Sequence, residues 1–145
     1  LTRHPFFPDA APQSLSVPMM VGNTHDETKG FIGWDAKAFP QTWDEVIARL
    51  PGQFAARIDI DPETVVAFYR QTYPNYSPAD VFFAASTAGR SWKAAIIQDE
   101  ERAKAGAPAY AYQVNWRSPM QGGIFGAPHT IDIGLVSRSK GRSKN

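Results

Sequence analysis

The sequence has no cysteine among its 145 residues. This absence excludes disulfide bonds, thiolate nucleophiles and every metal site that relies on cysteine ligands. It leaves the cellular compartment open, because many secreted chains also lack cysteine, and we expect the cytoplasm only slightly more than other compartments.

Long apolar runs are also absent. No stretch approaches the ~20 apolar residues that a membrane-spanning helix requires, and residues 1–5 contain no apolar signal core. We therefore expect no membrane partner. The chain starts with Leu rather than Met, which indicates that it begins inside a longer protein.

An excess of charge of one sign is lacking as well. The formal net charge is +1, and residues 137–145 hold four of the cations: Arg138, Lys140, Arg142 and Lys144. Without these four, the chain has 11 basic and 14 acidic residues. That balance does not give the basic surface that nucleic acid requires. We therefore expect no nucleic-acid partner, and we interpret residues 137–145 as a disordered or frame-shifted tail that follows a single domain at residues 1–136.

Several sequence motifs with known chemistry are missing. No G-x-S-x-G pattern occurs, and Ser91, the nearest candidate, lacks the second glycine and starts a predicted helix. The glycines of residues 122–126 do not form a G-x-G-x-x-G pattern, which argues against a nucleotide cofactor. Residues 25–27, His-Asp-Glu, lack the spacing that would direct three side chains at one metal ion. We expect neither a cofactor nor a metal.

Two segments have the pattern of strands. Residues 17–21 form a continuous apolar run that Gly22 closes, which is typical of a strand buried on both faces. Residues 110–114 alternate with a period of two. Helical signals separate the two segments, and this order predicts an α/β fold with a parallel sheet and a right-handed crossover. Residues 1–16, with three prolines, are predicted to form an extended entry segment.

Capping patterns mark the helices between the strands. Thr42 and Glu45 have the spacing of a capping box, ahead of a helix that should end near Pro51. Asp61 and Ser77 each precede a proline at the first helical position. These caps predict helices over about residues 62–72 and 78–88.

A longer helix is predicted over residues 91–105. Its apolar face should carry Trp92, Ala95 and Ile96, and its solvent face Glu100, Glu101, Arg102 and Lys104. The aromatic residues on and before it have core-like spacings. Packing in the core is therefore the expected role of these aromatic residues, and the alternative is that a minority of them line an apolar pocket. The residues are Phe68, Tyr69, Tyr73, Tyr76, Phe82, Phe83 and Trp92.

An acidic pair and a histidine follow the two predicted strands. Asp26 and Glu27 come just after the first strand, and His129 lies in a glycine-rich loop after the second. Parallel sheets keep their working groups in loops at the carboxyl ends of the strands. The acid could therefore orient the imidazole as in a hydrolase triad. The alternative interpretation is a hydrogen-bonded structural histidine and a solvated acidic turn.

These segments resemble the type-B carboxylesterases, the group of para-nitrobenzyl esterases and cholinesterases. RHPF at residues 3–6 through VPMMVGNTHDE at residues 17–27 is similar to the segment around the family's catalytic acid. GAPHTIDI at residues 126–133 is similar to its catalytic-histidine segment, and YAYQV at residues 110–114 to the strand before it. The likeness covers about residues 3–136.

The resemblance implies that Glu27 is the triad acid, that His129 is the general base and that Asp26 is a non-catalytic neighbour. It also implies that the chain forms the last portion of an α/β-hydrolase sheet with an inserted helical region. The substrate would be a small-molecule carboxylic ester, hydrolysed through an acyl-serine intermediate. Its acyl and alcohol pockets would draw on segments missing from this chain and also on Phe31, Trp34 and the helix that carries Phe82 and Phe83.

The chain also departs from that family. The serine elbow and the glycine-rich oxyanion loop do not occur in it, and the basic tail replaces the apolar stretch expected after Ile133. We therefore expect a fragment that is inactive and folds poorly without its partner, the N-terminal part of the same domain. The alternatives are a non-catalytic adhesion module and a defective remnant.

Overall fold

The computed structural model describes residues 2–53 and 60–136. Over these ranges the chain is a mixed α/β structure, as the order of sequence signals predicts. The basic tail at residues 137–145, with its predicted disorder, lies outside the described residues.

A parallel pair of strands forms the sheet of the described part. Strand β1 (Met19–Thr24) pairs with β2 (Ala109–Val114), so that Met19 is opposite Ala109 and Thr24 is opposite Val114. The parallel pairing confirms the prediction. The predicted start of β1 at residue 17 is wrong, because Pro18 has no N–H to donate to a ladder. The strand also continues through Gly22, over which the ring of Tyr112 lies closely enough to exclude a Cβ atom.

Capped helices connect the two strands. Helix α2 (Trp43–Arg49) begins with the predicted capping box of Thr42 and Glu45. Asp61 caps α3 (Pro62–Thr72), and Ser77 caps α4 (Pro78–Thr87). A π-helical turn, η4 (Ala88–Trp92), then joins α4 to α5 (Lys93–Lys104), so the two predicted helices form one continuous run.

Short elements complete the described chain. The sequence signals did not predict the helices α1 (Glu27–Ile32) and α6 (Ile131–Val136), each of six residues. Four single turns of 3-10 helix are also present: η1 (Pro12–Ser14), η2 (Ala36–Ala38), η3 (Leu50–Gln53) and η5 (Met120–Gly123). The entry segment therefore contains a helical turn, where the sequence predicted extended chain only.

Arg102 corrects the predicted solvent face of α5. Its residue exposure is 2%, because the guanidinium donates hydrogen bonds to the carbonyl oxygens of Ser14 and Val17. The sequence pattern placed Arg102 in water because its partners lie more than 80 positions away in the chain. The buried arginine fixes the entry segment to α5. On the predicted apolar face, Ile96 is 55% exposed.

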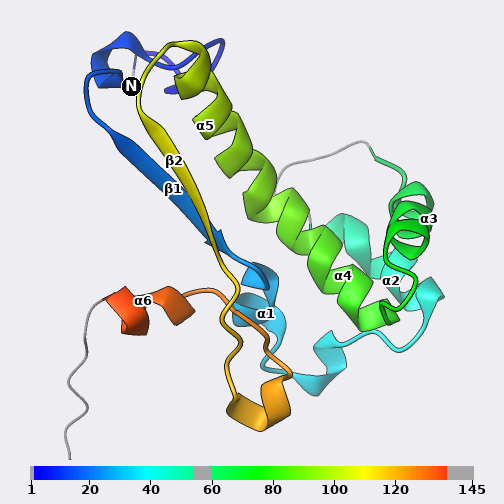
Figure 1. Ribbon diagram of the computed structural model, residues 1–145. Coiled ribbons are helices and arrows are strands. Elements are labelled where there is room, and N and C mark those ends of the chain that lie inside the picture. The colour runs from blue at the N-terminus through cyan, green and yellow to red at the C-terminus, as the bar shows by residue number, and fades with distance from the viewer. Residues whose placement is uncertain (1, 54–59, 137–145) are drawn as a thin grey trace, which may run out of the picture.

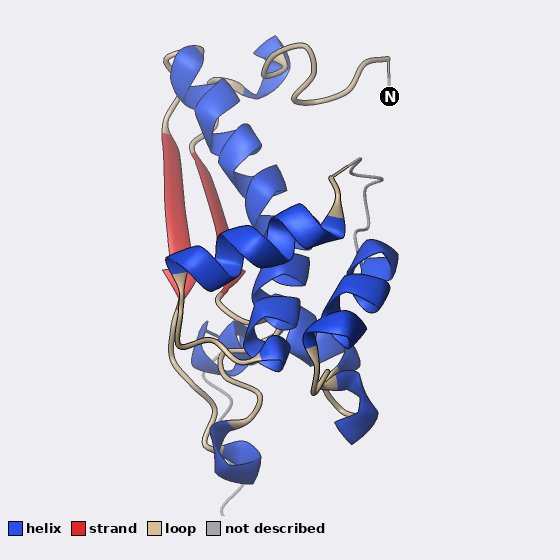
Figure 2. Ribbon diagram, turned by 90° about the vertical axis from the view of Figure 1, so that its right-hand side faces the viewer, coloured by secondary structure: helices blue, strands red, loops and turns tan. Residues whose placement is uncertain are grey.

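The hydrophobic core lies among α2, α3 and α4 and not under the sheet. Its buried side chains include Val46, Leu50, Val66, Phe82 and Phe83. The predicted packing role is thus confirmed for Phe82 and Phe83, whereas Phe68 is 59% exposed and Tyr73 43%. Helix α5 lies beside the sheet and connects it to this helical cluster (Figures 1 and 2).

Phe82 provides a test of this core. Phe82→Leu should lower the free energy of unfolding by about 1–2 kcal/mol, because it removes buried carbon atoms and leaves a cavity. Phe68→Leu is the matched control, since the Phe68 side chain is mostly exposed, and should change stability by less than about 0.5 kcal/mol. Urea denaturation of both variants measures the difference. Equal losses would show that the core does not lie where the structure places it.

Candidate active site

Glu27 lies at the point where β1 turns into α1. It is 8% exposed, and its Oε1 accepts the backbone N–H of Thr24 at 2.8 Å. This hydrogen bond reaches back to the last residue of β1 and holds the carboxylate in one orientation. The second oxygen, Oε2, is thereby directed away from the strand and toward the loop that follows β2.

His129 meets that carboxylate from the loop between β2 and α6. Its Nδ1 lies 2.6 Å from Glu27 Oε2, although the two residues are 102 positions apart. The next residue, Thr130, has a φ of 72°, which is rare for a β-branched side chain. Such strained backbone persists only where the surrounding structure fixes it, and it is most common at functional sites.

The contact determines the tautomer of the imidazole. A carboxylate oxygen accepts hydrogen bonds, so Nδ1 of His129 carries the proton and Nε2 has the free lone pair. The His129 side chain is 44% exposed, and the Glu27 side chain 10%. A half-exposed imidazole fixed by a buried acid can accept a proton at Nε2, with the carboxylate stabilising the imidazolium that forms.

Phe31 and Gly30 of α1 support the other side of His129. The ring of Phe31 stacks on the imidazole with 4.4 Å between centroids and 26° between planes. Gly30 lies so close that a Cβ there would be 2.7 Å from both N and Cβ of His129. The imidazole is thus held between the Glu27 carboxylate and the Phe31 ring.

The three predicted substrate-contacting phenylalanines separate in the structure. Phe31 is 47% exposed beside His129, whereas Phe82 and Phe83 are at most 1% exposed in the helical core. The Phe83 ring forms part of the wall of a cavity with Lys29 and Arg117, among others. A role for Phe82 and Phe83 in substrate binding stays a prediction, and in this structure Phe31 is the one that contacts the imidazole.

Asp26 has a structural role that the sequence did not reveal. Its backbone N–H donates to the carbonyl oxygen of Ala127 at 2.9 Å, and its Oδ2 accepts the N–H of Ala127 at 2.9 Å. These two hydrogen bonds join the β1–α1 turn to the residues just before His129. The signal that could have indicated this contact is Gly126, where φ is 60° and a Cβ would lie 2.6 Å from Asp26 Cγ.

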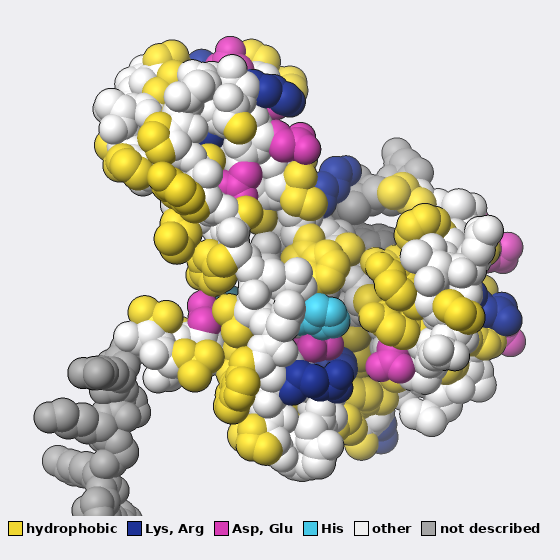
Figure 3. All heavy atoms as spheres, in the orientation of Figure 1, with side chains coloured by type: hydrophobic (Ala, Val, Ile, Leu, Met, Phe, Trp, Pro, Cys, Tyr) yellow, Lys and Arg dark blue, Asp and Glu magenta, His cyan; other side chains and the backbone are white. Residues whose placement is uncertain are grey.

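A backbone N–H and two neighbouring side chains lower the pKa of Asp26. Its Oδ1 lies 3.3 Å from Nζ of the buried Lys29, and its Oδ2 lies 3.1 Å from Nδ1 of His25. Burial raises the pKa of Asp26, but the Ala127 N–H, Lys29 and His25 together hold it below its ordinary value. Figure 3 shows a histidine on the visible face with acidic and basic side chains beside it.

Residues 2–53 and 60–136 contain neither a cluster of metal ligands nor a membrane-spanning helix. No group of three or more His, Asp or Glu side chains is placed there to hold a metal ion. None of the helices in the same residues has the length and apolarity needed to cross a bilayer.

Comparison with other proteins leaves the family assignment as a proposal. No model of a known protein family matches the chain, and no curated protein matches it either. The geometry around Glu27 and His129 therefore carries the functional argument.

Gly30 tests the close contact between α1 and the His129 loop. Gly30→Ala should lower the free energy of unfolding by about 1–3 kcal/mol, because the added methyl group overlaps backbone and side-chain atoms of His129. It should also remove the Nδ1 proton resonance of His129 that the hydrogen bond to Glu27 protects. Gly134→Ala is the control, because a Cβ there meets no atom within 4 Å. An unperturbed Nδ1 resonance in Gly30→Ala would contradict the contact.

Asp26 tests the electrostatics of the turn. Because its pKa is lower in the folded than in the unfolded chain, Asp26 stabilises the fold above about pH 3.9, and this contribution disappears as the pH falls through the folded-state pKa. Asp26→Asn should cost about 1–3 kcal/mol at pH 7, since it leaves the Lys29 ammonium buried without its counter-ion.

Urea denaturation of wild type and variant over a pH series gives the measurement. The stability difference should shrink as the pH falls below about 3.9. Glu100→Gln, an exposed carboxylate on α5, provides the control and should change stability little at any pH. If the stability difference between wild type and Asp26→Asn does not vary with pH, the charge of Asp26 does not contribute to the stability of the fold.

Proposed function

We propose that this chain provides the acid and the general base of a serine hydrolase that acts on carboxylic esters. The observation that carries the proposal is the 2.6 Å contact between Glu27 Oε2 and His129 Nδ1, with the other carboxylate oxygen held by Thr24 N–H. The resemblance to type-B carboxylesterases in the same two segments supports the same roles for the same two residues.

The arrangement of the strands supports an α/β-hydrolase portion. In that fold the acid and the histidine follow parallel strands and meet at their carboxyl ends, in the chain order acid and then histidine. Here Glu27 follows β1, His129 follows β2, and β1 pairs with β2 in parallel. The two strands and the capped helices between them are consistent with the last part of such a sheet.

The mechanism gives each residue one task. Nε2 of His129 removes the proton from a serine hydroxyl as the hydroxyl attacks the ester carbonyl, and then delivers that proton to the leaving alcohol. Glu27 holds the imidazole in the tautomer that leaves Nε2 free, and stabilises the imidazolium between the two transfers. Phe31, half exposed against the imidazole, would contact the apolar part of the ester.

The nucleophile must come from outside the described contacts. No hydrogen bond of residues 2–53 and 60–136 joins a serine to His129, and the sequence has no G-x-S-x-G elbow. A positioned base contributes about 10²–10⁴-fold to the rate, but only when a nucleophile and a bound carbonyl are present. The serine and its oxyanion donors would therefore be supplied by another segment, and this chain alone should not turn over esters.

Acylation of the imidazole tests whether His129 is a base in the absence of the serine. Diethyl pyrocarbonate should modify His129 at Nε2, and Glu27→Gln should slow this reaction about tenfold, because the carboxylate no longer stabilises the developing imidazolium. Mass spectrometry of peptides from time courses gives the rate at each histidine. His4 is the internal control, and Glu63→Gln, an exposed acid, is the matched variant.

The proposal fails if His129 reacts no faster than His4, or if Glu27→Gln leaves its rate unchanged. Either result would show that the pair is a structural hydrogen bond without effect on the reactivity of Nε2. A change in the rate of His4 in Glu27→Gln would instead point to a general loss of structure.

A further inference from the structure

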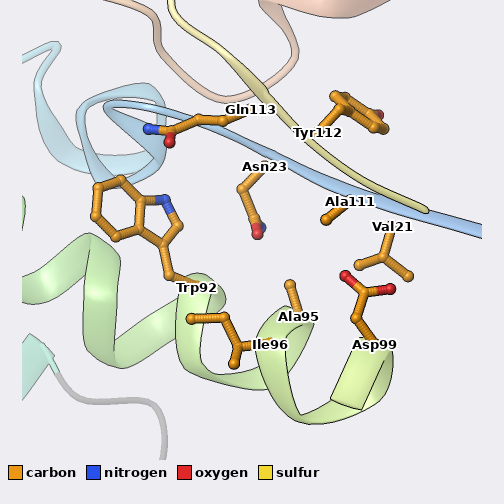
Figure 4. Close-up of a pocket in the computed structure, with 9 residues that line it drawn as sticks. All are labelled: Val21, Asn23, Trp92, Ala95, Ile96, Asp99, Ala111, Tyr112 and Gln113. Atoms are coloured by element: carbon orange, nitrogen blue, oxygen red, sulfur yellow. The ribbon is translucent and has the colours of Figure 1, made fainter. Parts of the chain in front are cut away.

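A cleft lies between the sheet and α5, away from Glu27 and His129. Its volume is about 360 Å³, and its walls come from both strands and from the face of α5 that looks toward them. The small side chains of Ala95 and Ala111 leave the space open. Figure 4 shows Trp92 at one end of the cleft and Asp99 at the other, with Asn23 directed into the middle.

One carboxylate oxygen of Asp99, Oδ1, is buried without a hydrogen-bond partner. No ion pair of the described residues includes Asp99. The nearby Arg102 on the same helix donates instead to the entry segment. A carboxylate oxygen that is removed from water is costly unless a cation or a donor compensates it. Among the residues that line the cleft, Asp99 is the one with a buried side-chain atom that lacks a hydrogen-bond partner.

Most of the remaining lining of the cleft is apolar, and the cleft is partly open to water. Val21, Ile96 and the indole of Trp92 line it, and Ile96 is 55% exposed. The indole is held in place because its Nε1 donates to the carbonyl oxygen of Thr24 at 3.4 Å. A ligand with an apolar body could cover this surface, while water could satisfy Asp99 only with further polar partners around it.

We propose that this cleft binds a small primary amine whose ammonium group pairs with Asp99 and whose apolar body lies against Trp92 and Ile96. The charge of the ligand follows from the unpaired carboxylate, and its size follows from the volume of the cleft. The amide groups of Asn23 and Gln113 are placed on the strand side to contact a polar substituent. The inference does not depend on the proposed esterase function, since neither Glu27 nor His129 lines the cleft.

Titration with a matched pair of probes tests the proposal. 2-Phenylethylamine is the amine probe, and 2-phenylethanol is its uncharged analogue. The indole N–H resonance of Trp92, assigned with Trp92→Phe, reports binding in NMR spectra at pH 7. The amine should bind at least tenfold more tightly than the alcohol, because only the amine can form a charge-assisted hydrogen bond with Asp99.

Three variants distinguish the contribution of the Asp99 charge to binding from the contribution of the shape of the cleft. Asp99→Asn should remove the preference for the amine, whereas Glu100→Gln, the exposed neighbour on α5, should keep it. Ala95→Leu should weaken binding of both probes, because its side chain fills the cleft. Spectra that remain dispersed show that each variant is folded.

Three results would overturn the proposal. The first is equal affinity for the amine and the alcohol. The second is an unchanged preference in Asp99→Asn. The third is a crystal structure grown with the amine in which a water molecule bridges Asp99 Oδ1 and the unpaired Nε of Arg102 while the cleft holds no amine.

Discussion

The parallel pairing of β1 with β2 is the constraint on which the site depends. The ladder brings Thr24 opposite Val114, and it continues past the strands, where His25 N–H donates to the Val114 carbonyl oxygen and Asp26 bridges to Pro128. Residues separated by about a hundred positions thus enter the same loop cluster in a fixed register. A slip by one residue would direct Glu27 away from His129, because successive strand side chains point to opposite faces.

The adjacent acids Asp26 and Glu27, which follow β1, make different contacts. Asp26 bonds the backbone of Ala127 and holds the loop, whereas Glu27 bonds the imidazole of His129 and sets its tautomer. Lys29 offsets the charge of Asp26, so that its carboxylate does not add a second unpaired negative charge beside Glu27. Asp26, to which the resemblance gives no catalytic role, is thus the acid that positions the loop carrying His129.

Sequence reasoning succeeded where the determining contacts are local and failed where they are distant. Thr42, Asp61 and Ser77 cap their helices as predicted, because a cap needs only the next three residues. The burial of Arg102 and the role of Asp26 could not be predicted, because their partners are distant in the chain. The pairing of Glu27 with His129 could be proposed from the strand order and from the resemblance, but not its geometry.

Because the imidazole of His129 is half exposed, a segment that supplies a nucleophile would also have to exclude water from it. His129 and Phe31 are both close to half exposed, and a base and a carbonyl react best where water is excluded. The guanidinium of Arg90 lies over the Phe31 ring, 4.4 Å from its centroid, so a segment that brings a serine to Nε2 would have to cover the imidazole itself. Thr24, the buried last residue of β1, contacts both Glu27 and Trp92 through its backbone. Its N–H orients Glu27, and its carbonyl oxygen accepts the indole N–H of Trp92 at the end of the α5 cleft. Glu27 and the cleft therefore both depend on the backbone of Thr24, Glu27 through the N–H of one peptide unit and the cleft through the carbonyl oxygen of the next.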